Sequence, residues 1–284
     1  MTAPIIRTRQ ELREMTNAWH RAGETIGVVP TMGALHDGHL SLVARAKEMS
    51  ARVIVTIFVN PKQFNNPDDL ANYPRTEHED ARKLERFEVD AIYVPDGAQM
   101  YPDGFATNIS VSGLTDVLCG AHRAGHFDGV ATVVTKLFTQ TAADFAFFGE
   151  KDFQQLQVVR RLAQDLDLGV EVVGCPTIRE MDGLAMSSRN LMLSDQARSR
   201  ASALNEVMEE MADALGQGAA IADLLPDAQA RLAAAGFGDI DYLEMRSNDT
   251  LTLLERATAP ARLFAAVFMA GVRLIDNIDV PLAR

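Results

Sequence analysis

The chain has 284 residues, 47% of them hydrophobic and 23% charged, which is enough for one large globular domain or two smaller ones. Its net charge is −12 without an obvious basic block, which argues against a protein that mainly grips a nucleic-acid backbone. The N-terminal residues lack a signal-peptide core, and the apolar run at 263–272 is too short to cross a membrane. We therefore expect a cytoplasmic protein without nucleic-acid or membrane partners, with Cys119 and Cys175 reduced.

Hydrophobic periodicity predicts alternating helices and strands up to about residue 177. In chain order we expect a helix at 8–23, a strand at 25–31, a helix at 39–50, a strand at 51–60, a polar loop at 60–76, a helix at 77–88, a strand at 89–96, a strand-like segment at 105–112, a loop at 119–129, a helix at 130–141, a strand at 143–149, a helix at 152–166 and a strand at 169–177. This alternation favours a doubly wound parallel sheet with helices on both faces.

The pattern changes near Pro176, where we place a domain boundary at about residue 177. A glycine-containing loop that includes residues 186–189 follows, and two Ala-rich helices are expected at about 195–215 and 221–235. Strands are expected at 240–247 and at 261–276, the second as one buried run. We thus predict one domain at 1–177 and a smaller α+β domain at 178–284.

The stretch VVPTMGALHDGHLSLVARAK places two histidines and two glycines between an apolar strand and an amphipathic helix. In doubly wound sheets ligands lie beyond the carboxyl ends of the strands, where helix N-termini favour anions. Gly33 and Gly38 permit a close approach of the backbone, and His36 and His39 can donate to phosphate oxygens. Because the pattern is neither GxxxxGK[ST] nor GxGxxG, it indicates another kind of nucleotide site. A metal site or a turn without chemistry is the alternative.

Nucleotidyltransferases with an HxGH turn pair it with a later KMSKS-type loop, and residues 186–189, MSSR, are similar to a short version of that loop. The HxGH stretch, FVNPKQF, YPRT, FFGEKDFQQL and MSSR occur in this order along the chain. With this set of segments the sequence resembles the pantoate–β-alanine ligases over essentially its whole length. The resemblance implies a Rossmann-like nucleotide-binding domain. It also implies a ligase that joins pantoate to β-alanine through a pantoyl-adenylate, consuming ATP with Mg²⁺ and releasing AMP and pyrophosphate. A homodimer is expected as well.

The same resemblance assigns residues to roles. His39, His36 and Lys151 would be catalytic, with His39 donating a hydrogen bond or proton to charge that develops on the phosphates. Gln63 and Gln155 would bind pantoate, and Gln63 would also lie near β-alanine. ATP would contact Met32, Gly33, Ala34, Leu35, His36, Asp37, Gly38, His39, Gly149, Glu150, Lys151, Asp152, Ile178, Met186, Ser187, Ser188 and Arg189.

Further residues remain candidates without a fixed role: Asn60, Tyr73, Arg123 and His126. The main rival function is an HxGH-type nucleotidylyltransferase that stops after nucleotidyl transfer. An aminoacyl-tRNA synthetase fits less well, because the chain is acidic and has no large anticodon-binding region. A nucleotide-binding regulator without catalytic activity would be expected to lack one of the two histidines.

Overall fold

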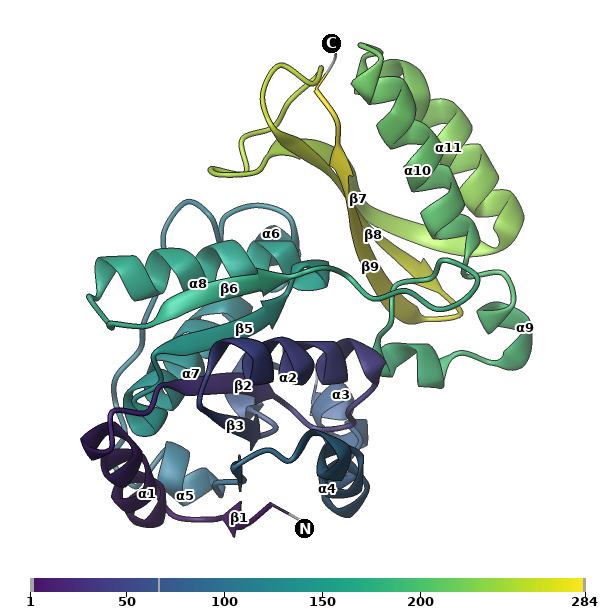
Figure 1. Cartoon of the computed structure of the whole chain (residues 1–284). Coiled ribbons are helices and arrows are strands. Elements are labelled where there is room, and N and C mark those ends of the chain that lie inside the picture. The colour runs from purple at the N-terminus through teal and green to yellow at the C-terminus, as the bar shows by residue number, and fades with distance from the viewer. Residues whose placement is uncertain (1–2, 66, 283–284) are drawn as a thin grey trace. The chain divides into compact units, whose positions relative to one another are not determined.

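The structure is a computed structural model that describes residues 3–65 and 67–282 (Figure 1). The chain divides into two compact units. The first takes the residues up to Thr115 together with Arg123–Glu150 and Gln155–Pro176. The second takes Asp116–His122, Lys151–Gln154 and the chain from Thr177 onward. Lys151 and Asp152 therefore group with the C-terminal unit, although a strand of the first unit ends at Gly149, two residues before Lys151.

The first unit contains a six-stranded parallel sheet in the order β1-β4-β3-β2-β5-β6. Its strands are β1 (Ile5–Ile6), β2 (Ile26–Thr31), β3 (Arg52–Ile57), β4 (Ala91–Tyr93), β5 (Phe145–Gly149) and β6 (Glu171–Cys175). From β2 the chain runs outward through β3 and β4 and then returns to β5, which pairs with β2 on its other side. The carboxyl ends of β2 and β5 thus meet at the switch point where such sheets bind ligands.

Helices cover both faces of this sheet, as the alternating sequence predicts. The helices of this unit are α1 (Arg9–Arg21), α2 (Asp37–Met49), α3 (Pro67–Asn72), α4 (Glu77–Leu84), α5 (Gly97–Met100), α7 (His126–Thr141) and most of α8 (Phe153–Asp165). On one face, Val43 of α2 and Leu84 of α4 share a buried cluster with Val55 of β3. On the other face, Phe138 of α7 meets Phe148 of β5 with ring centroids 6.2 Å apart.

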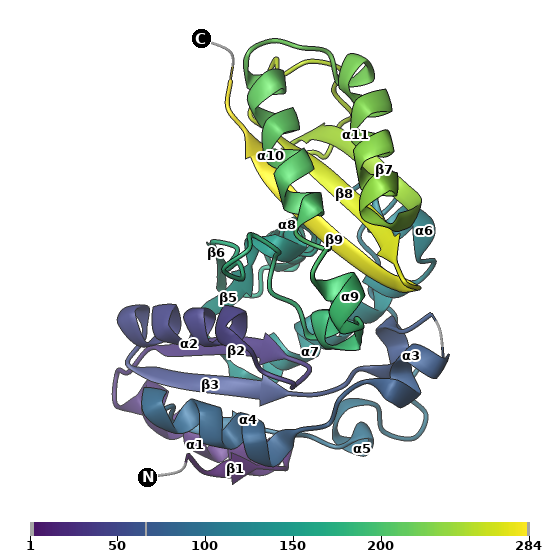
Figure 2. The same ribbon diagram turned by 90° about the vertical axis from the view of Figure 1, so that its right-hand side faces the viewer.

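The C-terminal unit contains an antiparallel sheet in the order β7-β8-β9. Its strands are β7 (Phe237–Ser247), β8 (Ala261–Met269) and β9 (Val272–Val280), and its helices include α6 (Cys119–His122), α9 (Asp195–Arg198), α10 (Ala203–Gly216) and α11 (Ile221–Ala235). Figures 1 and 2 show α10 and α11 side by side along this sheet. Their apolar side chains and those of the strands form one buried cluster. The expected fold class, a parallel sheet followed by a smaller α+β part, is confirmed.

Several expected elements have different bounds. The run 261–276 is a hairpin rather than one strand, because Ala270 and Gly271 take left-handed φ values of 49° and 80°. The helix expected at 195–215 breaks between Arg198 and Ala203, where the intervening residues SRAS include only one apolar side chain. The strand expected at 105–112 does not form, since Ile109 donates its N–H to the Thr132 hydroxyl, at 3.1 Å, instead of to a strand ladder.

The two predicted loops also contain helical turns. Within 60–76, a 3₁₀ turn covers Pro61–Gln63 and α3 follows, each with proline in its first turn. Within 119–129, α6 forms and α7 already begins at His126, four residues earlier than expected. Strand β1, which has two residues, was not predicted. Both cysteines are free, as expected, and both are buried.

Candidate active site

The turn between β2 and α2 holds its shape because a buried carboxylate binds its backbone. Gly33 and Ala34 have left-handed φ values of 86° and 51°. Asp80 of α4 is fully buried and accepts the N–H groups of Ala34 at 2.9 Å and of Leu35 at 2.8 Å. A left-handed φ like that of Ala34 is uncommon for a non-glycine residue. Two hydrogen bonds to an acceptor buried in α4 fix it here.

Helix α4 holds the same turn at a second point. Lys83 lies three residues after Asp80, and its Nζ donates to the Leu35 carbonyl at 2.5 Å. The Thr76 hydroxyl donates to Asp80 at 3.1 Å. A Cβ at Gly33 would lie 3.2 Å from Asp80 Oδ2, so the turn and the carboxylate fit closely. One helix thus binds both the N–H and the C=O groups of the HxGH turn.

The two histidines lie at the N-terminus of α2, with ring centroids 4.1 Å apart. His36 is the N-cap residue, and its backbone N–H donates to Nδ1 of His39 at 3.4 Å. The His39 side chain thus occupies the position that a Glu or Gln side chain has in a capping box. Because Nδ1 accepts, the neutral His39 ring carries its proton on Nε2. His39 is therefore oriented to donate from Nε2 at a positive helix end.

Gln63 lies against the HxGH turn. Its Nε2 is 3.0 Å from the sulfur of Met32, and its Oε1 accepts from Asn60 at 3.0 Å. Asn60 is buried and accepts from the Tyr101 hydroxyl at 2.7 Å. Burial raises the pKa of Tyr101, so this hydroxyl stays a donor. The structure thus brings a predicted pantoate ligand next to a predicted ATP contact.

Arg123 and His126 fix the backbone of Gln63. Nδ1 of His126 lies 2.8 Å from the Gln63 carbonyl and Nη2 of Arg123 lies 3.3 Å from it. Since a carbonyl only accepts, His126 donates from Nδ1 and accepts from Arg123 on Nε2 at 3.0 Å. The described contacts of these two residues therefore support the Gln63 segment. Tyr73, in turn, packs edge-on against Phe64 with ring centroids 5.6 Å apart.

In the C-terminal unit, Lys151 lies in the 3₁₀ turn Glu150–Asp152 that follows β5. Its side chain is 17% exposed, and Nζ is 3.8 Å from Asp152 Oδ1. Its carbonyl accepts from Asn277 of β9 at 2.8 Å. Gln155, which belongs to the first unit, is half-buried in the first turn of α8. Lys151 is thus a partly exposed cation on an anchored backbone.

The loop with MSSR begins as a small hairpin. Arg179 and Ala185 form an antiparallel bridge, and the Met186 N–H donates to the Ile178 carbonyl at 3.0 Å. Ser187 then caps the 3₁₀ turn Ser188–Met192, accepting the N–H of Arg189 at 3.2 Å. The hairpin therefore brings together Ile178 and Met186, two predicted ATP contacts that are distant in sequence. The half-buried Ser188 and Arg189 follow immediately.

Sequence reasoning missed the residues that hold these segments. Asp80 lies in a helix with many charged residues, but it shares a face with the buried Leu84 four positions later, which was a usable signal. Asp276 occurs in strand phase with Val272 and Leu274, which are buried, so a carboxylate there required a partner. No sequence signal distinguishes Asn277, whose role follows from its contact with Lys151.

Neither a cluster of metal ligands nor a membrane span is found in residues 3–65 and 67–282. Among these residues no three His, Cys, Asp or Glu side chains gather as metal ligands would. No helix in the same part of the chain combines the length and apolarity needed to span a bilayer.

The sequence model of the pantoate-beta-alanine ligase family matches residues 4–279. The chain belongs to the pantoate–β-alanine ligase family. The pantothenate synthetase of Roseobacter denitrificans is 70% identical over the full length of both chains, and that of Ruegeria pomeroyi is 64% identical over 99% of this chain and 98% of its own. Membership makes the chain a ligase that uses ATP to form an amide bond.

Solved structures agree with this family assignment. The chain superposes on the crystal structure of pantothenate synthetase from Thermus thermophilus with a TM-score of 0.91 at 44% identity, covering 98% of this chain and 99% of that one. The pantoate–β-alanine ligase of Francisella tularensis, solved with a β,γ-ATP ligand and β-alanine, gives a TM-score of 0.83 at 33% identity, covering 98% and 97%.

Proposed function

We propose that this chain joins pantoate to β-alanine through a pantoyl-adenylate, with ATP as co-substrate and AMP and pyrophosphate as products. The observation that carries the proposal is the family match over residues 4–279 in a chain whose His39 is oriented to donate from Nε2. A carboxylate is a poor electrophile, whereas its adenylate has a good leaving group. The first step needs charge neutralisation and in-line positioning, because the attacking carboxylate is already ionised.

In this proposal the HxGH turn binds ATP in the first unit. The backbone of residues 32–35 would lie along the nucleotide, since Asp80 fixes its geometry. Nε2 of His39 would donate to charge that develops on the phosphates, and His36 would support it at the positive end of α2. Gly149 ends the neighbouring strand β5 and Glu150 follows it, and both would contribute from there.

Lys151, Asp152 and the MSSR loop are the candidates for the remaining ATP contacts. Lys151 provides a compact positive charge for the phosphates, and Asp152 could accept from the ribose hydroxyls. The MSSR loop offers the Ser187 and Ser188 hydroxyls and the Arg189 guanidinium beside Met186 and Ile178. Mg²⁺ would enter with ATP and be held mainly by phosphate oxygens. We also propose that the chain forms a homodimer and acts in the cytoplasm.

Gln63 and Gln155 would bind pantoate, and Gln63 would also contact β-alanine. A carboxamide both donates and accepts, which suits a hydroxy acid, and it adds no charge next to the phosphates. Gln63 is held for this role through its side chain by Asn60 and through its carbonyl by His126. The contact of Gln63 with Met32 supports a pantoate site beside the proposed nucleotide turn.

Pyrophosphate exchange without amine tests the adenylate mechanism. With pantoate, ATP and Mg²⁺ but no β-alanine, labelled pyrophosphate should enter ATP, and β-alanine should then release AMP and pantothenate. A nucleotidylyltransferase of another pathway would give no pantoate-dependent exchange. ADP as product, or full turnover without exchange, would rule out the adenylate route.

Gln63→Ala should weaken the use of pantoate more than that of ATP. Leaving substrate polar groups unpaired costs roughly 1–3 kcal/mol, so the KM for pantoate should rise about 5-fold to 160-fold. Gln155→Ala should behave alike, whereas Gln164→Ala, at an exposed position of α8, should match the wild type. Steady-state kinetics with each substrate varied in turn is the measurement. Impaired ATP use with normal pantoate saturation would contradict the assignment.

A further inference from the structure

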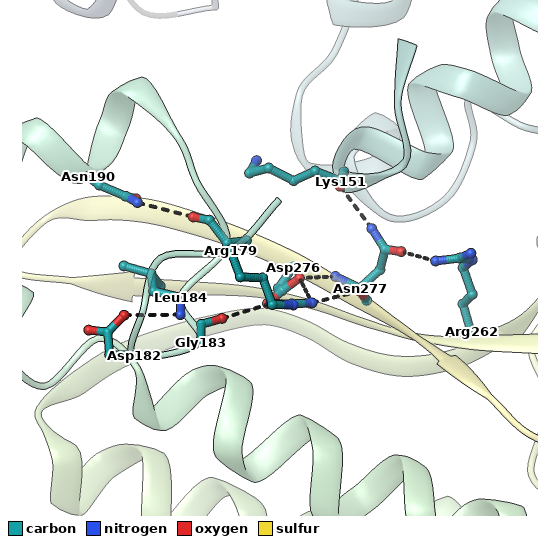
Figure 3. A network of polar contacts seen from close by, with 10 residues as sticks. Lys151, Arg179, Asp182, Gly183, Leu184, Asn190, Arg262, Asp276 and Asn277 are labelled. Carbon is teal, nitrogen blue, oxygen red and sulfur yellow. Dashed lines mark hydrogen bonds and ion pairs between the residues drawn. The ribbon is translucent and has the colours of Figure 1, made fainter. Parts of the chain in front are cut away.

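Asn277 joins Lys151 to the core of the C-terminal unit (Figure 3). Its side chain is buried, and Nδ2 donates to the Lys151 carbonyl at 2.8 Å. Its Oδ1 accepts from Nη1 of Arg262 at 2.8 Å, which orients the amide. The Arg262 guanidinium also lies over the ring of Phe153, 4.3 Å from its centroid, and Phe153 begins α8. The backbone that carries Lys151 is thus held from β9.

The preceding residue, Asp276, holds the hairpin that leads into MSSR. Its side chain is 1% exposed and accepts from Nη1 and Nη2 of Arg179 at 2.7 and 3.1 Å. Nη1 of Arg179 also donates to the Gly183 carbonyl at 3.1 Å, across the turn of the hairpin. A buried bidentate pair of this kind is geometrically specific. Figure 3 shows that Arg179 extends from the hairpin to β9.

The contacts to Lys151 and to Arg179 are both made by neighbouring residues of β9. Consecutive side chains of a strand point to opposite faces. Asp276 therefore binds Arg179 of the MSSR hairpin from one face of β9, and Asn277 binds the Lys151 backbone from the other. Asp276 shares its phase with the buried Val272 and Leu274, while Asn277 pairs in register with Phe264. The Asn277 N–H also donates to Asp276 Oδ1 at 2.7 Å, which links the two residues directly.

We infer that Asp276 and Asn277 are a positioning pair that sets Lys151 and the MSSR hairpin in fixed relation within the C-terminal unit. The inference rests on the proposed function, in which both segments bind the ATP phosphates. Neither residue of the pair touches substrate in this scheme. Asn277 acts through Lys151, and Asp276 acts through Arg179. A cation misplaced by about 1 Å loses much of its effect on the reacting group, on the order of 10²-fold in rate.

Asn277→Asp tests the Lys151 contact with little change of shape. It removes the Nδ2 donor, sets a carboxylate against the Lys151 carbonyl, and keeps the acceptor for Arg262. Pantoate-dependent pyrophosphate exchange should fall about 10-fold or more, divided between kcat and KM for ATP as in Lys151→Ala. In a Lys151→Ala background the same substitution should change the rate by less than about 2-fold, since coupled residues are not additive.

Ser247→Ala is the matched control. Ser247 is buried in β7 of the same sheet, and its hydroxyl accepts the Thr252 N–H at 3.1 Å. This variant should lower the Tm but leave exchange and the KM for ATP unchanged. If Asn277→Asp does not yield folded protein, Asn277→Ala serves the same comparison, because it removes the donor without adding charge.

Asp276→Asn tests the other half of the pair. Hydrogen exchange at the Glu180 and Met186 amides, which bond across the hairpin, should become faster in Asp276→Asn and stay unchanged in Asn277→Asp. Normal pyrophosphate exchange in Asn277→Asp, or effects that add fully to those of Lys151→Ala, would overturn the inference. Failure of the wild type to catalyse pantoate-dependent pyrophosphate exchange would instead refute the proposed function.

Discussion

His39→Ala is expected to slow adenylate formation by about 10²–10³-fold, the usual cost of removing one donor that stabilises transition-state charge. The geometry gives a specific reason. His39 Nδ1 is occupied by the His36 N–H, so Nε2 is the atom that carries the proton in the neutral ring. Single-turnover formation of pantoyl-adenylate, measured with the folded variant, is the direct readout. A folded His39→Ala protein with near-normal turnover would contradict the role of His39.

His39→Gln separates the loss of the cap from the loss of the donor. Glutamine at this third helical position can accept the His36 N–H, as in an ordinary capping box. The variant should therefore retain more stability than His39→Ala, with a Tm closer to that of the wild type. Its rate should remain low, because its amide cannot both cap the helix and reach the place of the imidazole Nε2. Recovery of both stability and rate would mean that His39 only caps α2.

Elements with a clear period could be predicted from the sequence, and elements set by single contacts could not. The alternation of apolar strands and amphipathic helices predicted the parallel sheet, because both periods depend only on burial. The hairpin at 261–280 was missed because Ala270 and Gly271 interrupt an apolar run without a polar turn residue. The irregular course of 105–112 depends on Thr132, a partner that no local pattern indicates.

The candidate site divides in the same way. Residues proposed to touch substrate lie in short segments whose composition is unusual, such as the HxGH turn and MSSR, so the sequence alone indicates them as candidates. Residues that support them, such as Asp80 and Asn277, have ordinary neighbours in the sequence. Their importance comes from burial against a segment that is distant in the sequence. Asp80 accepts the N–H of Leu35, and Asn277 donates to the carbonyl of Lys151. Sequence patterns predict whether a side chain is buried better than they predict which residue it contacts.

Asp80→Asn is expected to destabilise the fold and to impair ATP use, because one buried carboxylate binds the HxGH turn at two amides. Asparagine keeps one oxygen, so its NH₂ group must face an N–H of Ala34 or Leu35. One buried donor left without an acceptor costs about 1–3 kcal/mol of stability. Chemical denaturation should therefore show a lower free energy of unfolding.

The loss of activity in Asp80→Asn should exceed what the loss of stability explains. Ala34 needs its left-handed φ of 51° to direct the turn, and without two bonds to Asp80 this conformation is no longer favoured. A displacement of about 1 Å in a group that aligns substrate costs up to about 10²-fold in rate. Tyr93→Phe is the matched control, since it removes a buried 2.9 Å hydrogen bond within the same unit to Gln140, which lies on α7 and not on the helix α4 that binds the turn. At a temperature well below both transitions, Tyr93→Phe should exchange pyrophosphate at the wild-type rate. Asp80→Asn should be slower and should need more ATP, and equal rates in the two variants would show that Asp80 contributes only stability.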